Sequence, residues 1–167
     1  MPYSDPDNKG LAVEWLAELS PESALDVGPG AGAYGKLLRG LPTVSRLNAV
    51  EAWQAYIPEF RLAGIYDNVF VTDVREHQDF AYDVVIFGDV LEHMGRDDAL
   101  TVYETAREQA GNVLFSIPII HLPQGAYADN PFEVHVEEDW SHDEILDWFP
   151  GIYRAEKFRV TGLYLAQ

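Results

Sequence analysis

Three glycines alternate with other residues along one short stretch, LDVGPGAG at residues 25–32. Gly28, Gly30 and Gly32 can adopt a positive φ and leave room for a ligand to approach the main chain. A helix that begins near Gly32 would direct its free N–H groups at the same place. Because tight packing alone seldom needs three alternating glycines, we expect this turn to bind a small molecule.

Asp26 precedes the first glycine by two residues and narrows the class of ligand. The segment from Gly30 to Gly35 matches G-x-G-x-x-G, the fingerprint of dinucleotide-binding turns. Glu51 follows these glycines along the chain at about the separation expected for the acid that binds a ribose. A carboxylate beside a pyrophosphate would be repelled, whereas one beside an ammonium group would be attracted. Asp26 therefore favours a zwitterionic ligand without phosphate, and NAD remains the weaker alternative.

The elements that must position these residues alternate between strands and helices. Short apolar runs predict buried strands at 24–28, 46–51, 68–73, 82–89 and 112–118. Apolar periodicity and end signals predict helices at 11–19, 34–41, 57–63, 96–110 and 141–148, with a short turn at 74–78. The last residues predict an antiparallel hairpin joined at Thr161-Gly162. This alternation predicts an α/β fold with a doubly wound, mostly parallel sheet and helices on both faces.

Acidic residues at two further strand ends complete a set of motifs. Glu51 stands at the end of the strand predicted at 46–51, within the stretch VEAW at 50–53. Asp73 ends the stretch FVTD at 70–73, and YDVVIFGDVLEHM occupies residues 82–94. Together with LDVGPGAG, these motifs resemble those of class I S-adenosylmethionine-dependent methyltransferases over about residues 22 to 118. The resemblance implies a Rossmann-like, seven-stranded sheet with an antiparallel C-terminal strand in a single domain, residues 1–167.

The same resemblance implies S-adenosylmethionine as cofactor and S-adenosylhomocysteine as product. It implies that Glu51 accepts from both ribose hydroxyls, a task that suits a carboxylate, and that Asp73 accepts from the adenine amino group near the main-chain N–H of Val74. Trp53 either stacks on the adenine or caps the core. The cofactor-binding residues expected are Asp26, Gly28, Gly30, Gly32, Glu51, Ala52, Trp53, Asp73, Val74 and Asp89.

The methyl acceptor is expected to meet the loops after the fourth and fifth strands, at 89–93 and 119–142. Methyl transfer requires an acceptor in the right position, and a hydroxyl or amine acceptor must lose its proton. An imidazole titrates in the useful range. His135 and His93 are therefore the predicted catalytic bases, and His121 is a further candidate.

The segment 119–140 is long and has no clear period, and loops of that length in a compact domain are usually functional. An alternative is that His135 and Trp140 only fold this loop against the sheet. Acidic and imidazole groups also lie close together there in the sequence, at Glu133, His135, Asp139 and His142. Their spacing matches no known metal signature, and no metal is predicted.

Charge argues against a nucleic-acid partner. The chain has 28 acidic and 11 basic residues, for a formal net charge of -17, which repels phosphate backbones. DVLEH is similar to a motif of many small-molecule methyltransferases and differs from the [DNS]-P-P-[YFW] of methyltransferases that act on nucleic-acid bases. Asn130-Pro131-Phe132 lacks one proline of that motif and follows the fifth strand instead of the fourth.

The chain contains no cysteine, so disulfides, thiolate metal sites and a cysteine nucleophile are excluded. Residues 1–15 lack the basic and apolar regions of a targeting signal, and no stretch reaches the roughly 18 apolar residues of a membrane span. We therefore expect a cytoplasmic protein without a membrane partner.

These observations predict a methyltransferase of minimal size, monomeric or homodimeric, that acts on a small or medium-sized metabolite such as a sugar or a hydroxylated compound. The N-terminal helix and the 119–140 loop would recognise that acceptor. Two alternatives remain open. One is a non-catalytic S-adenosylmethionine-binding module or a protein methyltransferase, and the other, less favoured, is an NAD-dependent oxidoreductase.

Overall fold

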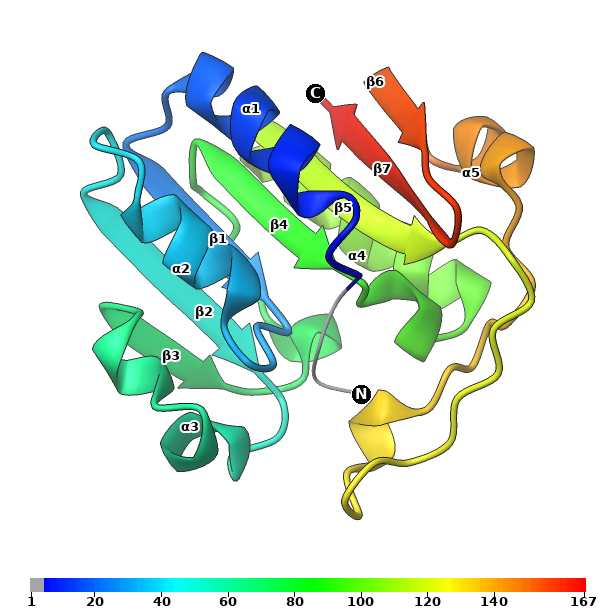
Figure 1. Ribbon diagram of the computed structural model, residues 1–167, viewed down its shortest axis with the longest axis horizontal. Coiled ribbons are helices and arrows are strands. Elements are labelled where there is room, and N and C mark those ends of the chain that lie inside the picture. The colour runs from blue at the N-terminus through cyan, green and yellow to red at the C-terminus, as the bar shows by residue number, and fades with distance from the viewer. Residues whose placement is uncertain (1–4) are drawn as a thin grey trace.

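A computed structural model describes residues 5–167 as one sheet flanked by helices (Figure 1). The strands are β1 (Ser23–Val27), β2 (Arg46–Glu51), β3 (Asn68–Val71), β4 (Val84–Gly88), β5 (Asn112–Pro118), β6 (Ile152–Lys157) and β7 (Thr161–Ala166). The α-helices are α1 (Lys9–Leu19), α2 (Ala33–Arg39), α3 (Tyr56–Glu59), α4 (Arg96–Gln109) and α5 (His142–Trp148). Short 3-10 helices are η1 (Leu62–Gly64), η2 (Val74–Glu76), η3 (Leu91–His93) and η4 (Pro131–Glu133).

The sheet has seven strands in the order β3-β2-β1-β4-β5-β7-β6. The first five strands along the chain pair in parallel, and β7 is antiparallel to both β5 and β6. The predicted fold class is therefore confirmed. The strand order reverses direction between β1 and β4, and a crevice at such a switch point is where open α/β sheets bind their ligands.

Two apolar cores lie on opposite faces of the sheet. Strand side chains alternate between them: Leu25 and Val27 pack on the face covered by α4 and α5, and Ala24 packs on the face covered by α1 and α2 (Figure 1). Asp26 follows the same alternation as Ala24 and therefore points toward the α2 side. This orientation governs which groups can contact its carboxylate.

The C-terminal hairpin turns at a different place from the one predicted. Thr161 and Gly162 belong to β7, and the turn lies before them, where the N–H of Phe158 donates to the carbonyl oxygen of Thr161 at 2.9 Å. A Cβ at Gly162 would collide with the phenol of Tyr164. This glycine therefore makes room for an aromatic ring inside the strand, and the prediction of a turn at that point was wrong.

Most helix predictions agree with the structure, with one interruption. The expected helix at 57–63 is divided into α3 and η1 because Arg61 adopts a left-handed φ of 55°. The helix predicted at 141–148 is present as α5, and Ser141 and Glu144 form a reciprocal capping box at its start. Within residues 5–167, no helix combines the length and the apolar composition needed to cross a membrane.

Candidate functional site

A cavity of about 340 Å³ lies at the carboxyl ends of the central strands. The turn after β1, the residues after β2 and β3, and the segment from Gly88 to Met94 form its walls, and residues of the 119–140 loop close it. Its volume falls within the range of small-molecule sites in proteins. The cavity therefore occupies the place expected for a ligand at the switch point of the sheet.

The glycine turn forms part of this wall. Gly28, Gly30 and Gly32 all have the predicted positive φ, at 60°, 50° and 73°. Gly28 and Gly30 line the cavity, but Gly32 does not. Gly32 caps α2, and a Cβ there would come within 2.7 Å of the Ile65 side chain. Gly32 therefore serves the packing of α2 against its neighbours.

The carboxylate of Asp26 is buried on the α2 side of the sheet, although the residue lines the cavity. The hydroxyl of Tyr66 donates to its Oδ2 at 2.5 Å. Burial raises the pKa of Asp26 to about 7, against the opposing effects of the Tyr66 hydrogen bond and the positive charge of Lys9. Asp26 therefore already has a hydrogen-bond donor and a nearby cation within the protein.

Lys9, on α1, supplies that positive charge. Its Nζ lies 4.1 Å from the centre of the Tyr34 ring and is attracted electrostatically by Asp89 and Asp26. Burial lowers the pKa of Lys9 in spite of these acids. The sequence contained no signal that the first helix would place a cation beside the acidic residues of the glycine turn.

Glu51 ends β2 at the cavity and is 5% exposed. Its Oε1 accepts from the main-chain N–H of Trp53 at 2.8 Å. Burial raises its pKa to about 7. Ala52 also lines the cavity, whereas Trp53 does not and packs, partly buried, against the core on the α2 face. The sequence left two alternatives for Trp53, stacking on the adenine or capping the core, and its position agrees with the second.

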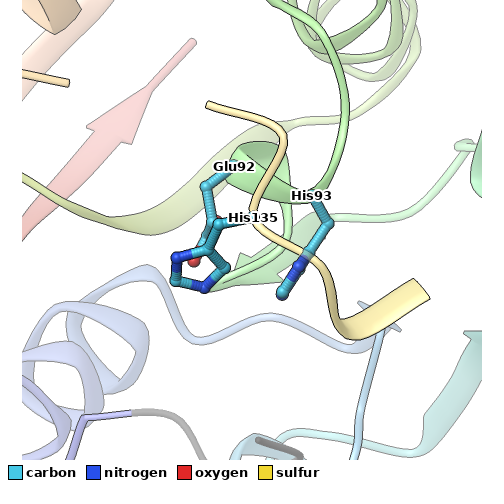
Figure 2. Close-up of side chains that lie close together, drawn as sticks. All are labelled: Glu92, His93 and His135. Atoms are coloured by element: carbon cyan, nitrogen blue, oxygen red, sulfur yellow. The ribbon is translucent and has the colours of Figure 1, made fainter. Parts of the chain in front are cut away.

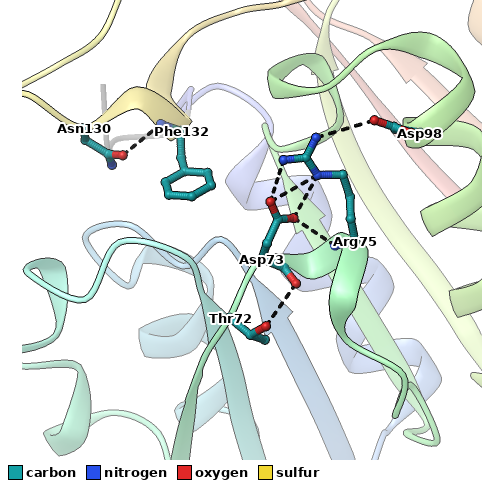
Figure 3. Close-up of polar contacts among 6 residues, drawn as sticks. All are labelled: Thr72, Asp73, Arg75, Asp98, Asn130 and Phe132. Atoms are coloured by element: carbon teal, nitrogen blue, oxygen red, sulfur yellow. Dashed lines mark hydrogen bonds and ion pairs between the residues drawn. The ribbon is translucent and has the colours of Figure 1, made fainter.

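Asp73 and Val74 line the cavity after β3, but the carboxylate of Asp73 is already paired (Figure 3). The guanidinium of Arg75 donates to its Oδ1 at 3.0 Å and to its Oδ2 at 2.5 Å, and the main-chain N–H of Arg75 adds a bond of 2.9 Å. These hydrogen bonds lower the pKa of Asp73. Arg75 itself lines the cavity and is not predicted from the sequence, where nothing distinguishes it from a surface arginine.

Asp89 lies on the cavity wall in a left-handed conformation, with a φ of 58°. The hydroxyl of Ser116 donates to its Oδ1 at 2.6 Å, and the N–H of Asp5 donates to its Oδ2 at 3.0 Å. A positive φ at a residue with a side chain costs of order 1–3 kcal/mol and persists only where the surrounding contacts hold it. Ser116 on β5 therefore holds Asp89 in this strained position at the switch point.

Glu92, His93 and His135 line the cavity, and their side chains come together there (Figure 2). Glu92 and His93 belong to η3, and His135 comes from the 119–140 loop. The Nδ1–H of His93 donates to the carbonyl oxygen of Val134 at 3.1 Å, and that of His135 donates to the carbonyl oxygen of Leu122 at 2.6 Å. Because Nδ1 carries the proton in both rings, each Nε2 is left with a free lone pair.

Glu92 is 1% exposed, and among residues 5–167 neither of its carboxylate oxygens has a hydrogen-bond partner. Burial, with the nearby charge of Asp89, raises its pKa well above the ordinary value. Its main-chain oxygen accepts from the N–H groups of Val136 and Glu137, at 2.9 and 3.1 Å. These bonds attach the 119–140 loop to η3 and bring His135 to the cavity.

The other imidazole and acidic groups of the loop lie apart from this cluster. His121 is largely exposed and contacts Asp139 at 2.7 Å, and His142 bonds to the hydroxyl of Tyr164 at 2.8 Å. Glu133 accepts from the hydroxyl of Tyr56 at 2.9 Å. The acidic and imidazole residues at 133–142 therefore form no single site, and only His135 of that set joins a potential ligand group among the described residues.

Several cavity residues are not among the predicted binding or catalytic residues. They come from elements far apart in the chain, which only the folded structure brings together. They are Tyr34, Tyr56, Arg75, Gln124, Phe132 and Glu133.

The fold is similar to that of solved methyltransferase structures, although no protein-family model and no curated protein matches the sequence. An S-adenosylmethionine-dependent methyltransferase from Clostridium acetobutylicum has a TM-score of 0.71 and 15% identity, over 98% of this chain and 92% of that one. The complex of DhpI with S-adenosylhomocysteine (SAH) has a TM-score of 0.72 and 16% identity, over 96% of this chain and 84% of that one. The N-terminal domain of EvdMO1 with SAH bound has a TM-score of 0.69 and 12% identity, over 98% and 82%. This likeness establishes the fold.

Proposed function

We propose that this chain, which has the fold of S-adenosylmethionine-dependent methyltransferases, binds S-adenosylmethionine and methylates a hydroxylated small or medium-sized metabolite. One observation carries the proposal. A single cavity joins the glycine turn and the buried acid at the end of β2 to a cluster of two imidazoles and a carboxylate. One part of the cavity suits a cofactor, and the other suits the group that receives the methyl.

The residues of the cofactor side fit this ligand. Glu51 is a buried carboxylate at the cavity, and its Oε1 accepts from the main-chain N–H of Trp53. A ribose diol would supply two further donors to such an acid. Gly28 and Gly30 line the cavity with positive φ, which few residues other than glycine adopt readily. The missing Cβ of Gly28 makes room for the side chain of Val90, which also lines the cavity. We expect Val74 and Asp73 to border the adenine.

When bound, S-adenosylmethionine supplies an electrophilic methyl carbon on a positively charged sulfur. The protein must orient the acceptor oxygen toward that carbon and provide for the proton that the oxygen loses. In the metal-free protein, the Nε2 atoms of His135 and His93 are our predicted proton acceptors, because both Nδ1 atoms are occupied by hydrogen bonds to carbonyl oxygens. Burial lowers the pKa of His93, which favours its neutral form.

The chemistry of the acceptor side supports a hydroxylated metabolite. Polar groups from separate elements surround this part of the cavity: Glu92, His93, Gln124, Glu133 and His135. Their oxygen and nitrogen acceptors suit the donors of a polyol or a sugar. The net charge of -17 disfavours a polyanionic acceptor.

Calorimetry with S-adenosylhomocysteine tests the cofactor assignment. We expect micromolar affinity, about -8 kcal/mol, which Glu51→Ala should weaken at least tenfold. Glu59→Ala is the matched control, since Glu59 is an exposed acid on the neighbouring α3 and lies outside the cavity. Binding of NAD in place of S-adenosylhomocysteine, or equal affinity for the Glu51 and Glu59 variants, would contradict the proposal.

A further inference from the structure

Three ligating side chains converge on one point of the cavity wall (Figure 2). One ligand atom from each of Glu92, His93 and His135 lies within 4.8 Å of the others. The rings of His93 and His135 meet edge to face, with centres 5.0 Å apart. This cluster is the one group among the described residues whose ligand atoms lie close enough to share an ion.

The hydrogen bonds around the cluster prepare both imidazoles for an ion. Histidines that bind metals almost always donate their other ring N–H to a carboxylate, a carbonyl oxygen or water, which fixes the tautomer and the ring orientation. His93 and His135 do so through Nδ1, to Val134 and Leu122. Both acceptors are main-chain oxygens of the loop that closes the cavity, so the two rings keep Nε2 as the ligating atom.

Glu92 supplies the second, independent observation. A buried polar group without a hydrogen-bond partner is rare and costs free energy. The carboxylate of Glu92 is 1% exposed, and neither oxygen has a partner among residues 5–167. Asp89 and Glu133 add negative charge around it. A divalent cation would satisfy its oxygens and neutralise this excess of negative charge.

We propose that Glu92, His93 and His135 bind a divalent transition-metal ion at the acceptor side of the cavity. Two imidazoles and one carboxylate suit Zn²⁺, Mn²⁺ or Fe²⁺, whereas Mg²⁺ and Ca²⁺ prefer oxygen ligands throughout. Bonds of about 2.1 Å place ligand atoms roughly 3.4 Å apart around a tetrahedral ion. The ligand atoms, which lie within 4.8 Å of one another without an ion, would have to move closer together on binding it.

The role of the ion rests on the proposed function. Three protein ligands leave coordination positions open, and an ion in such a site binds substrate oxygens and lowers the pKa of a bound hydroxyl. The ion would occupy the Nε2 atoms of both histidines. In the loaded protein these residues would therefore act on the acceptor through the metal, and the proton of the metal-bound hydroxyl would pass to solvent water instead of to either imidazole.

Metal titration of the chelator-treated chain tests the site without any methyl acceptor. By calorimetry, we expect Zn²⁺ and Mn²⁺ each to bind with one site per chain, and Mg²⁺ to bind at least tenfold more weakly. Glu92→Gln and His135→Ala should each weaken Zn²⁺ binding at least 100-fold. The matched control is His121→Ala, which removes an exposed imidazole outside the cavity and should leave the affinity unchanged.

Thermal unfolding separates loss of the site from loss of the fold. Zn²⁺ should raise the melting temperature of the unmodified chain but not that of Glu92→Gln, which remains folded because it replaces an unpartnered carboxylate with a neutral amide. No stoichiometric Zn²⁺ or Mn²⁺ binding, or equal binding by Glu92→Gln, would overturn the metal site. Binding of S-adenosylhomocysteine to the same metal-free protein is measured separately, so failure of the metal site and failure of the cofactor assignment give different results.

Discussion

The guanidinium of Arg75 donates to both carboxylate oxygens of Asp73, the acid that the resemblance assigns to the adenine amino group (Figure 3). Its Nη1 also reaches Asp98 at 3.5 Å. Asp73 therefore has little hydrogen-bonding capacity left for a nucleoside. The sequence predicts that the acids at the strand ends are free to accept hydrogen bonds from the ligand. The pairing with Arg75 makes Asp73 differ from that expectation.

Removal of Arg75 should strengthen cofactor binding. In Arg75→Ala, Asp73 loses three side-chain hydrogen bonds and can accept from the adenine amino group. A charge-assisted hydrogen bond gained in this way corresponds to about 1 kcal/mol, or roughly fivefold in affinity. Calorimetry with S-adenosylhomocysteine measures the effect, and exposed Arg159→Ala is the control. Weaker binding by Arg75→Ala would mean that the arginine itself contacts the ligand.

The affinity for S-adenosylhomocysteine should depend on pH through Glu51. Burial raises the pKa of this acid to about 7, and the ionised form accepts best from two hydroxyls. Affinity should therefore rise with pH through about 7 and level off above about pH 8, by up to tenfold per pH unit below 7. The pKa of Asp26 lies in the same range, so the pH dependence is also measured for Glu51→Gln. This variant should bind S-adenosylhomocysteine more weakly, and the part of the pH dependence that comes from Glu51 should disappear.

Glu92→Gln should stabilise the metal-free protein at alkaline pH. The folded-state pKa of Glu92 is raised by burial, so the folded chain retains a proton that the unfolded chain loses as pH increases. Stability is therefore lost as pH rises above the ordinary carboxyl range. Glutamine avoids this cost, and the gain should reach about 1–3 kcal/mol at pH 8 and be smaller at pH 5. Denaturant unfolding in the presence of chelator at both pH values measures this gain in the free energy of unfolding. An equal gain at the two pH values would show that the raised pKa of Glu92 is not its cause.

The cofactor side was largely predictable because its residues follow local rules. Alternating glycines and acids at the ends of parallel strands meet at one edge of the sheet whatever the rest of the chain does. Gly28, Glu51 and Asp89 accordingly line the cavity. Trp53 turns away from it because the choice between ligand and core depends on a side-chain rotamer, which no local pattern specifies.

The cluster on the acceptor side was not predictable as a cluster. The sequence places Glu92 and His93 in the loop after β4 and His135 in the loop after β5, and nothing in it joins the two. Their meeting depends on the hydrogen bonds by which the N–H groups of Val136 and Glu137 bind the main-chain oxygen of Glu92. Contacts of a long loop that contains only one short 3-10 helix leave no periodic trace in the sequence.

Tyr66→Phe should destabilise the fold, with the larger effect at high pH. The hydroxyl of Tyr66 is the side-chain donor to the buried carboxylate of Asp26. Without it, the ionised form loses a partner, and the pKa of Asp26 rises further above 7. We expect a loss of about 1–3 kcal/mol at pH 8 and a smaller loss at pH 5, where Asp26 is protonated in both proteins. Denaturant unfolding at the two pH values is the measurement, and Tyr127→Phe, which alters an exposed phenol, is the control.

Phe132 should contribute to binding of the nucleoside. Its ring is 40% exposed, lines the cavity and lies across from Asp73, where the resemblance places the adenine (Figure 3). An aromatic face that is still partly open to solvent gains apolar contact when a base stacks on it, and one such stack is worth about 1–3 kcal/mol. Phe132→Ala should therefore weaken the binding of S-adenosylhomocysteine, measured by calorimetry, at least fivefold. Tyr127→Ala removes a ring of similar exposure, 38%, from the same loop outside the cavity and should have no effect. Equal affinities for the two variants would mean that the base lies elsewhere, and that Phe132 faces the methyl acceptor instead.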